Sequence, residues 1–190
     1  MADKGMIFNG EMVRATLDSR KTQTRRPINP QPPDHLDEIQ PILIGSCAVW
    51  QDNDGCRFEA RSPYQVGDRL WVKETWAVSV GVMGSVVYKA DGSGKPADGY
   101  KWRASIHMPK CIARLWLEVT GVRVEQLQEI SEEDIRAEGV VVPRWNPDSV
   151  KEYPDPWKVY AEFWDSIYAK KHPWESSLWA WVYELRRIDG

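Results

Sequence analysis

Two short stretches of the sequence carry residue types that could hydrolyse an acyl bond. The stretch DSRKTQTRRP, residues 18–27, places Lys21 three positions before Thr24. The stretch GDRLWVKETWAV, residues 67–78, contains Glu74 among strand-forming residues. A threonine hydroxyl becomes a nucleophile only when a base takes its proton, and a lysine amine can serve as that base. Lys21, Thr24 and Glu74 are therefore the candidate catalytic residues.

Lys21 needs an unusual environment to act as a base. The pKa of a lysine is ordinarily about 10.4, and it must fall toward about 7–8 for the amine to accept a proton near neutral pH. A fall of about three units corresponds to roughly 4 kcal/mol, which requires a real pocket. Neighbouring arginines and aromatic rings push the pKa of Lys21 down, whereas Glu74 would pull it back. Glu74 could hold Lys21 in place or protonate the departing nitrogen.

The two stretches are predicted to be strands, which fixes the faces on which their side chains lie. A helix at 10–18, capped by Asn9, is expected just before the first strand. Alternate side chains of a strand share a face, so Thr24 and Arg26 should lie together, while Lys21 at the turn can point to either side.

On the second strand, Glu74 and Trp76 should share one face, with Trp71 on the other. If both strands line one pocket, Arg26, Trp71 and Trp76 are the candidate substrate-binding residues. A tryptophan ring stacked on a flat base contributes about 1–3 kcal/mol. The alternative is structural: Glu74 pairs with Arg26 or Lys21 beside a tryptophan of the core.

The rest of the chain predicts more strands than helices. Residues 29–65, rich in Pro, Asp and Gly, are interpreted as an insertion with one hairpin turning at Asp54 and Gly55, and 140–155 as a second insertion. Strands are expected at 85–90, at 111–127 with a bend near Gly121, and in the closing SLWAWVYELRRI, and helices at 131–139 and 156–169. This pattern predicts an α+β fold, a small twisted β-barrel with flanking helices, as a single domain over 1–190.

Composition narrows the class of protein. The chain has 190 residues and 11 tryptophans, and no apolar run approaches the roughly 20 residues of a membrane span. Its three cysteines form no CxxC pair, which favours a reducing cytoplasm. Three widely spaced histidines show no metal-binding pattern, and a pairing of His107 with Cys111 is weak. We therefore expect a cytoplasmic protein with no metal, no cofactor and no membrane partner.

Charge is distributed unevenly although the net charge is only −3. Residues 1–30 hold six Lys/Arg against three Asp/Glu, whereas residues 124–165 hold four against eleven. Residues 101–123 are basic again. Such asymmetry is compatible with a local positive surface for RNA or with solvated faces of mixed sign.

The quoted residues resemble the ASCH domain, a PUA-like β-barrel fold. LDSRKTQTRRPI, GDRLWVKETW, ISEEDIRAEG and an FW-containing helix carry the resemblance over most of the chain, and the long form with insertions is similar to proteins of phages and prophages. The family pattern GxKxxExR becomes Ser19, Lys21, Thr24 and Arg26, with Lys21 and Arg26 matching.

The threonine in place of the family's glutamate resembles one bacterial subgroup that hydrolyses the amide of N4-acetylcytidine. The resemblance implies a metal-independent amidohydrolase in which Lys21, Thr24 and Glu74 take the roles of the subgroup's lysine, threonine and glutamate. Its partner would be a small-molecule modified nucleoside or nucleobase. The alternatives are an RNA-binding module without activity and a phage protein that only docks on a host partner.

Overall fold

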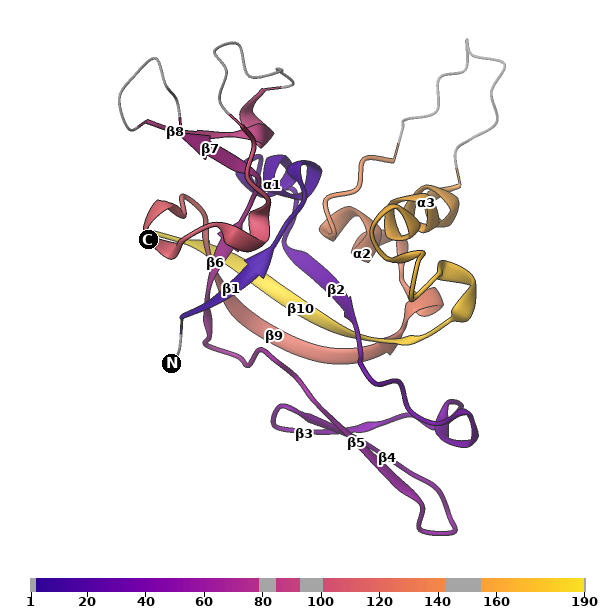
Figure 1. Ribbon diagram of the computed structural model, residues 1–190. Helices are drawn as coiled ribbons and strands as arrows, with labels where there is room; N and C mark the ends of the chain where they lie inside the picture. The colour runs from indigo at the N-terminus through magenta and orange to yellow at the C-terminus, as the bar shows by residue number, and fades with distance from the viewer. Residues whose placement is uncertain (1–2, 79–84, 93–100, 143–154, 190) are drawn as a thin grey trace, which may run out of the picture.

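The computed structural model describes residues 3–78, 85–92, 101–142 and 155–189. Its centre is a five-stranded mixed sheet with strand order β1-β6-β9-β10-β2 (Figure 1). β1 runs parallel to β6, and the other neighbours are antiparallel. The strands are β1 (Asp3–Ile7), β2 (Gln23–Pro27), β6 (Arg69–Lys73), β9 (Trp116–Gln126) and β10 (Trp179–Ile188).

The sheet curves strongly but does not close into a barrel in the described residues. β1 and β2 are its two edges. A side-chain hydrogen bond links these two edge strands: Arg26 Nη2, on β2, donates to the carbonyl of Ile7, on β1, at 2.7 Å. The bend expected near Gly121 is present as a shift of register between β9 and β10 at Glu184 and Leu185. The mixed α+β class is confirmed, and the strands of the described residues do not close the expected barrel.

Three α-helices flank the sheet in the described part of the chain, and the first two begin at the capping residues that the sequence predicts. They are α1 (Gly10–Leu17), α2 (Glu132–Ala137) and α3 (Pro156–Tyr168). Asn9 accepts the backbone N–H of Met12, and Ser131 accepts that of Asp134. Each side chain satisfies a donor that the first helical turn would otherwise leave without a partner. α1 and α3 face each other across one end of the sheet (Figure 1).

Residues 29–65 are more ordered than the predicted insertion with one hairpin. They contain a three-stranded antiparallel sheet of β3 (Ile42–Ile44), β4 (Cys47–Gln51) and β5 (Arg57–Arg61). Trp50 is fully buried and packs edge-on against Trp179 of β10, with 5.6 Å between ring centroids. The segment therefore contributes to the main hydrophobic core. Of the second expected insertion, residues 143–154 lie outside the described residues.

The strand predicted at 67–78 divides into β6 and β7 (Trp76–Val78), and β7 pairs with β8 (Val86–Tyr88) in a separate ribbon. The division falls at Glu74, where the backbone leaves the main sheet. The predicted alternation survives the break, since Val72, Glu74 and Trp76 are all buried while Trp71 is half-buried. Glu74 thus lies at the junction of two sheets rather than within a strand.

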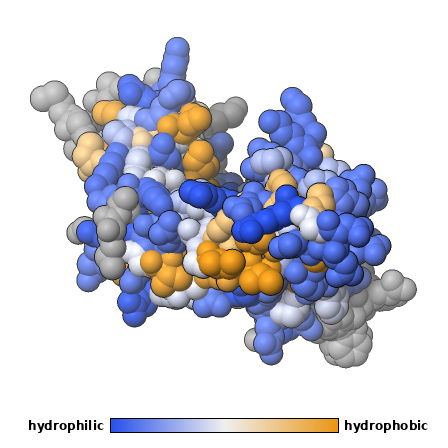
Figure 2. Space-filling model, turned by 90° about the horizontal axis from the view of Figure 1, so that it is seen from below, coloured by the Kyte–Doolittle hydropathy of each residue, from blue (hydrophilic) through white to orange (hydrophobic). Residues whose placement is uncertain are grey.

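The outer strand of the smaller sheet keeps apolar side chains in solvent. Ile42 and Ile44 of β3 are 68% and 62% exposed. Seen from below, the side of the molecule on which this sheet lies carries a group of hydrophobic residues in a largely hydrophilic surface (Figure 2). Among the described residues, no helix is long and apolar enough to cross a membrane.

Gly139 occupies a backbone conformation that only glycine adopts freely. Its φ is +81°, and a Cβ there would lie 2.6 Å from the Cβ of Ala15 and 2.9 Å from that of Lys21. Gly139→Ala should therefore destabilise the protein by about 2–4 kcal/mol, as left-handed strain of about 1–2 kcal/mol adds to the overlap. Denaturation in urea measures the loss.

Gly55→Ala is the matched control, because Gly55 has φ +86° but nothing within 4 Å of the added Cβ. Its cost should be that of the backbone strain alone. Equal losses for the two variants would contradict the close packing of Gly139 against Lys21.

Candidate active site

Lys21 is buried and all three of its ammonium hydrogens have acceptors. Nζ lies 2.7 Å from Glu138 Oε2, 3.0 Å from the carbonyl of Glu138 and 2.8 Å from that of Gln23. Backbone pairing between Lys21 and Glu138 fixes the two residues against each other. The lysine is thus held at the join between the start of β2 and the end of α2.

Burial lowers the pKa of Lys21, the contact with Glu138 raises it in part, and Arg26 and Arg25 lower it again. Removing an ammonium from water favours its neutral form, so desolvation outweighs the ion pair here. A lysine with a lowered pKa was expected from the sequence. The carboxylate that opposes the fall was expected to be Glu74, and it is Glu138.

Thr24 is fully buried on β2, and its hydroxyl oxygen Oγ1 has no hydrogen-bond partner. Strand alternation puts Thr24 on the same face as Arg26, as predicted. Lys21 Nζ and Arg26 Cζ lie 5.5 Å and 5.9 Å from the centre of the Phe8 ring. The structure therefore gathers Lys21 and Arg26 around one aromatic ring. Thr24 lies between them in sequence, and among the described contacts no hydrogen bond joins its hydroxyl to Lys21.

Glu74 forms its ion pair with a different partner from those expected. Both of its carboxylate oxygens accept from Arg114, each at 2.8 Å. Arg114 also donates to Asp91 at 2.6 and 2.7 Å. A bidentate arginine–carboxylate pair fixes Glu74 firmly. The predicted contact of Glu74 with Lys21 or Arg26 is absent among the described contacts, because Glu138 and Tyr168 occupy those cations.

The basic stretch that begins β2 does not form an open positive surface. Arg25 is buried, with Nη2 2.6 Å from Glu125 and 2.7 Å from Asp134. Burial opposes the charge of Arg25, but its carboxylate neighbours raise its pKa above the ordinary value. Arg20 is exposed and pairs with Asp18. Acidic residues after position 124 thus neutralise part of the basic N-terminal segment, which explains the uneven charge of the sequence.

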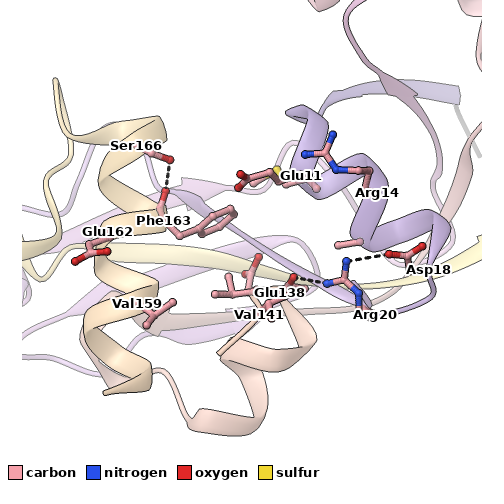
Figure 3. Close-up of a pocket in the computed structure, with 14 residues that line it drawn as sticks. Glu11, Arg14, Asp18, Arg20, Glu138, Val141, Val159, Glu162, Phe163 and Ser166 are labelled. Atoms are coloured by element: carbon pink, nitrogen blue, oxygen red, sulfur yellow. Dashed lines mark hydrogen bonds and ion pairs between the residues drawn. The ribbon is translucent and has the colours of Figure 1, made fainter. Parts of the chain in front are cut away.

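A cavity of about 600 Å³ lies between α1 and α3, within the range of small-molecule sites. Phe163 and Ser166 come from α3, and Glu11 and Arg14 from α1, with Glu138 at the base (Figure 3). The ring of Phe163 points into the space between the helices (Figure 3). A second cavity of about 580 Å³ is lined by Glu74, and the two share Glu11, Arg14 and Ser166.

The predicted substrate-binding residues lie apart from both cavity walls. Trp76 is buried under Arg103, whose Cζ is 4.9 Å from a Trp76 ring centre. Trp71 packs against Lys73, whose Nζ lies 4.8 Å from the centre of a Trp71 ring. Arg26 donates to the hydroxyl of Tyr168 at 2.6 Å. The aromatic ring that the cavity does offer is Phe163.

Glu138 and Phe163 are the site residues that the sequence reasoning missed. Glu138 belongs to the stretch ISEEDIRAEG, where it was interpreted only as part of a helix before Gly139. Phe163 belongs to the amphipathic helix expected at 156–169. The sequence signal for Glu138 is Gly139, which follows it. A glycine is required there because the backbone at Gly139 packs closely against Ala15 and Lys21.

Comparison with protein-family models finds no match for the chain, and comparison with curated proteins finds none either. Among solved structures, the chain is similar to the crystal structure of protein EF3133 from Enterococcus faecalis V583, described as DUF984. The TM-score is 0.44 at 11% sequence identity, over 100% of this chain and 77% of that chain. The evidence for the site therefore comes from the contacts within this chain alone.

Proposed function

We propose that this protein is a metal-independent amidohydrolase of the ASCH, PUA-like type that removes acyl groups from N4-acylated cytosine or cytidine. The observation that carries the proposal is a buried lysine of lowered pKa on the same short segment as a buried threonine hydroxyl without a partner. A buried hydroxyl without a partner costs about 1–3 kcal/mol, and such costs often accompany functional sites. Lys21 is the base and Thr24 the nucleophile.

The reaction would proceed in two steps. Neutral Lys21 takes the proton of Thr24 Oγ1 while the oxygen attacks the acyl carbon, and the carbon–nitrogen bond then breaks. The proton passes to the departing N4 amine, which leaves as cytosine or cytidine. Water then attacks the acyl-threonine ester, with Lys21 again as the base, and releases the carboxylic acid and Thr24.

Two carboxylates have separate places in this proposal. Glu138 would position Lys21 and set its pKa, because it is the carboxylate in contact with the ammonium. Glu74, proposed from the sequence as the supporting carboxylate, lines the second cavity, where Arg114 fixes it. Its contribution would be to the shape and charge of the adjoining cavity.

The cavity between α1 and α3 suits a flat polar ligand of nucleoside size. Phe163 offers a stacking face, worth about 1–3 kcal/mol per base, and Glu11 and Ser166 offer polar groups. Neither Lys21 nor Thr24 lines the cavity, but Glu138, whose carboxylate contacts the Lys21 ammonium, does. Substrate binding must therefore open the wall at Glu138 to bring the acyl carbon to Thr24.

Incubating the purified protein with N4-acetylcytidine, after treatment with a chelator, should release cytidine and acetate in equal amounts. Chromatography of the nucleosides and an enzymatic assay of acetate measure both products. N-acetyl-lysine, an amide without the pyrimidine ring, should remain intact in the same preparation.

If cytidine is not released under these conditions, the amidohydrolase proposal is wrong. The RNA-binding alternative then predicts an affinity for RNA that falls steeply with salt, since each phosphate contact releases a counterion. Arg20→Glu, at the exposed cation of the basic stretch, should weaken such binding.

A further inference from the structure

A cluster of metal-ligating side chains lies beside the three-stranded sheet, at the turn between β4 and β5 and on a short helix that precedes β3. His35 belongs to a short 3₁₀ helix (Asp34–Leu36), Asp52 follows β4, and Cys56 precedes β5. One ligand atom from each of the three lies within 4.8 Å of the others. His35 Nε2 lies 3.1 Å from Cys56 Sγ. Imidazole, thiolate and carboxylate thus meet although His35 and Cys56 stand 21 positions apart in the chain.

The backbone holds these three side chains in place. Asp52 Oδ1 accepts from the backbone N–H groups of Cys56 at 2.7 Å and Asp54 at 3.0 Å. These bonds use one carboxylate oxygen and leave Oδ2 as the oxygen that can coordinate. On the other side, Leu36 is fully buried in the core and fixes the turn that carries His35. The donors therefore come from two anchored segments rather than from free chain.

We infer that His35, Asp52 and Cys56 form a binding site for a divalent zinc ion, independent of the proposed amidohydrolase site. Zinc takes nitrogen, sulfur and oxygen ligands in a tetrahedron, at about 2.0 Å from nitrogen and about 2.3 Å from sulfur. Those bond lengths put neighbouring nitrogen and sulfur ligands about 3.5 Å apart. A shift of a few tenths of an ångström would bring His35 and Cys56 to that spacing.

Three protein ligands leave the fourth position to water or to a further ligand. The cysteine must lose its proton to bind, so zinc binding releases a proton and weakens at low pH. The ion would tie the turn between β4 and β5 to the 3₁₀ helix before β3. Bound zinc would thereby stabilise the segment that contributes Trp50 to the hydrophobic core.

Cobalt and zinc titrations test this site directly. The reduced protein, stripped of metal by a chelator, should bind one Co²⁺ with the visible absorption of a four-coordinate ion and a near-ultraviolet sulfur-to-cobalt band. One equivalent of Zn²⁺ should displace the cobalt, protect Cys56 from alkylation and raise the melting temperature. Loss of an outer partner of a metal ligand costs about 10–100-fold in affinity, so His35→Gln and Asp52→Asn should weaken zinc binding by at least about tenfold.

Cys56→Ser should remove the sulfur-to-cobalt band, whereas the matched controls Cys111→Ser and His107→Gln should bind as the unaltered protein does. Cys111 is exposed and stands close to His107 in the sequence, yet the described cluster does not include either residue. The site is wrong if no sulfur-to-cobalt band forms. It is equally wrong if the band survives Cys56→Ser, or if zinc leaves the alkylation rate of Cys56 unchanged.

Discussion

Thr24→Val should abolish release of cytidine from N4-acetylcytidine while leaving the protein at least as stable as before. Valine keeps the shape of threonine but lacks the nucleophilic oxygen, and loss of a nucleophile costs about 10³-fold or more. Because Thr24 Oγ1 is buried without a partner, replacing it with a methyl group removes a desolvation cost of about 1–3 kcal/mol. Initial rates of cytidine release and the midpoint of urea denaturation give the two measurements.

Thr22→Val is the matched control, since Thr22 is two positions away on the same segment and is exposed. Its rate should equal that of the unaltered protein. A stable Thr24→Val protein with undiminished activity would exclude Thr24 as the nucleophile. A large loss of stability would instead show that the hydroxyl has a structural partner.

Local patterns predicted the elements that carry the site. Asn9 and Ser131 cap their helices as their residue types indicate, and Pro27 ends β2. Alternation along β2 put Thr24 and Arg26 on one face. Glu74, directly after β6, and Trp76, the first residue of β7, are both buried, as the alternation of the predicted strand indicated. These features depend on residues a few positions apart, so a single sequence is sufficient to predict them.

Partner choice could not be predicted, because it depends on which segments the fold brings together. Lys21 and Glu138 are 117 positions apart, and Glu74 meets Arg114 across 40 positions. The sequence contains several carboxylates that could pair with each of these cations, and nothing in it distinguishes between them. The proposed metal cluster was not predicted for the same reason. Spacing along the sequence offered only the weak pair His107 and Cys111, whereas a fold can assemble ligands from any separation.

Breaking the buried ion pair between Lys21 and Glu138 should cause the largest loss of stability. Lys21→Met leaves the carboxylate of Glu138 buried without its nearest cation, and breaking a buried pair typically costs about 3–5 kcal/mol. Lys21→Met/Glu138→Leu removes both charges and should recover much of that loss, since apolar replacements of buried pairs are often neutral. Urea denaturation of both single variants and the double variant measures the coupling. The recovered double variant should still be inactive, because it lacks the base.

Dependence on pH separates a structural role of this pair from a catalytic one. Burial lowers the pKa of Lys21 in the folded protein, so between that pKa and about 10.4 the unfolded chain binds more protons. Stability of the unaltered protein relative to Lys21→Met should therefore rise with pH across this window. Activity should rise through the pKa of Lys21, because only the neutral amine accepts the proton of Thr24.

Glu138→Gln tests the tuning of Lys21 most sharply. It removes the charge that raises the pKa of Lys21 while keeping a side chain of similar shape, so the rising limb of the pH–rate profile should move to lower pH. Glu11→Gln, which changes another carboxylate of the same cavity, should leave the limb where it is. An unmoved limb in Glu138→Gln, with stability lost, would mean that the pair only holds β2 to α2 and that the base lies elsewhere.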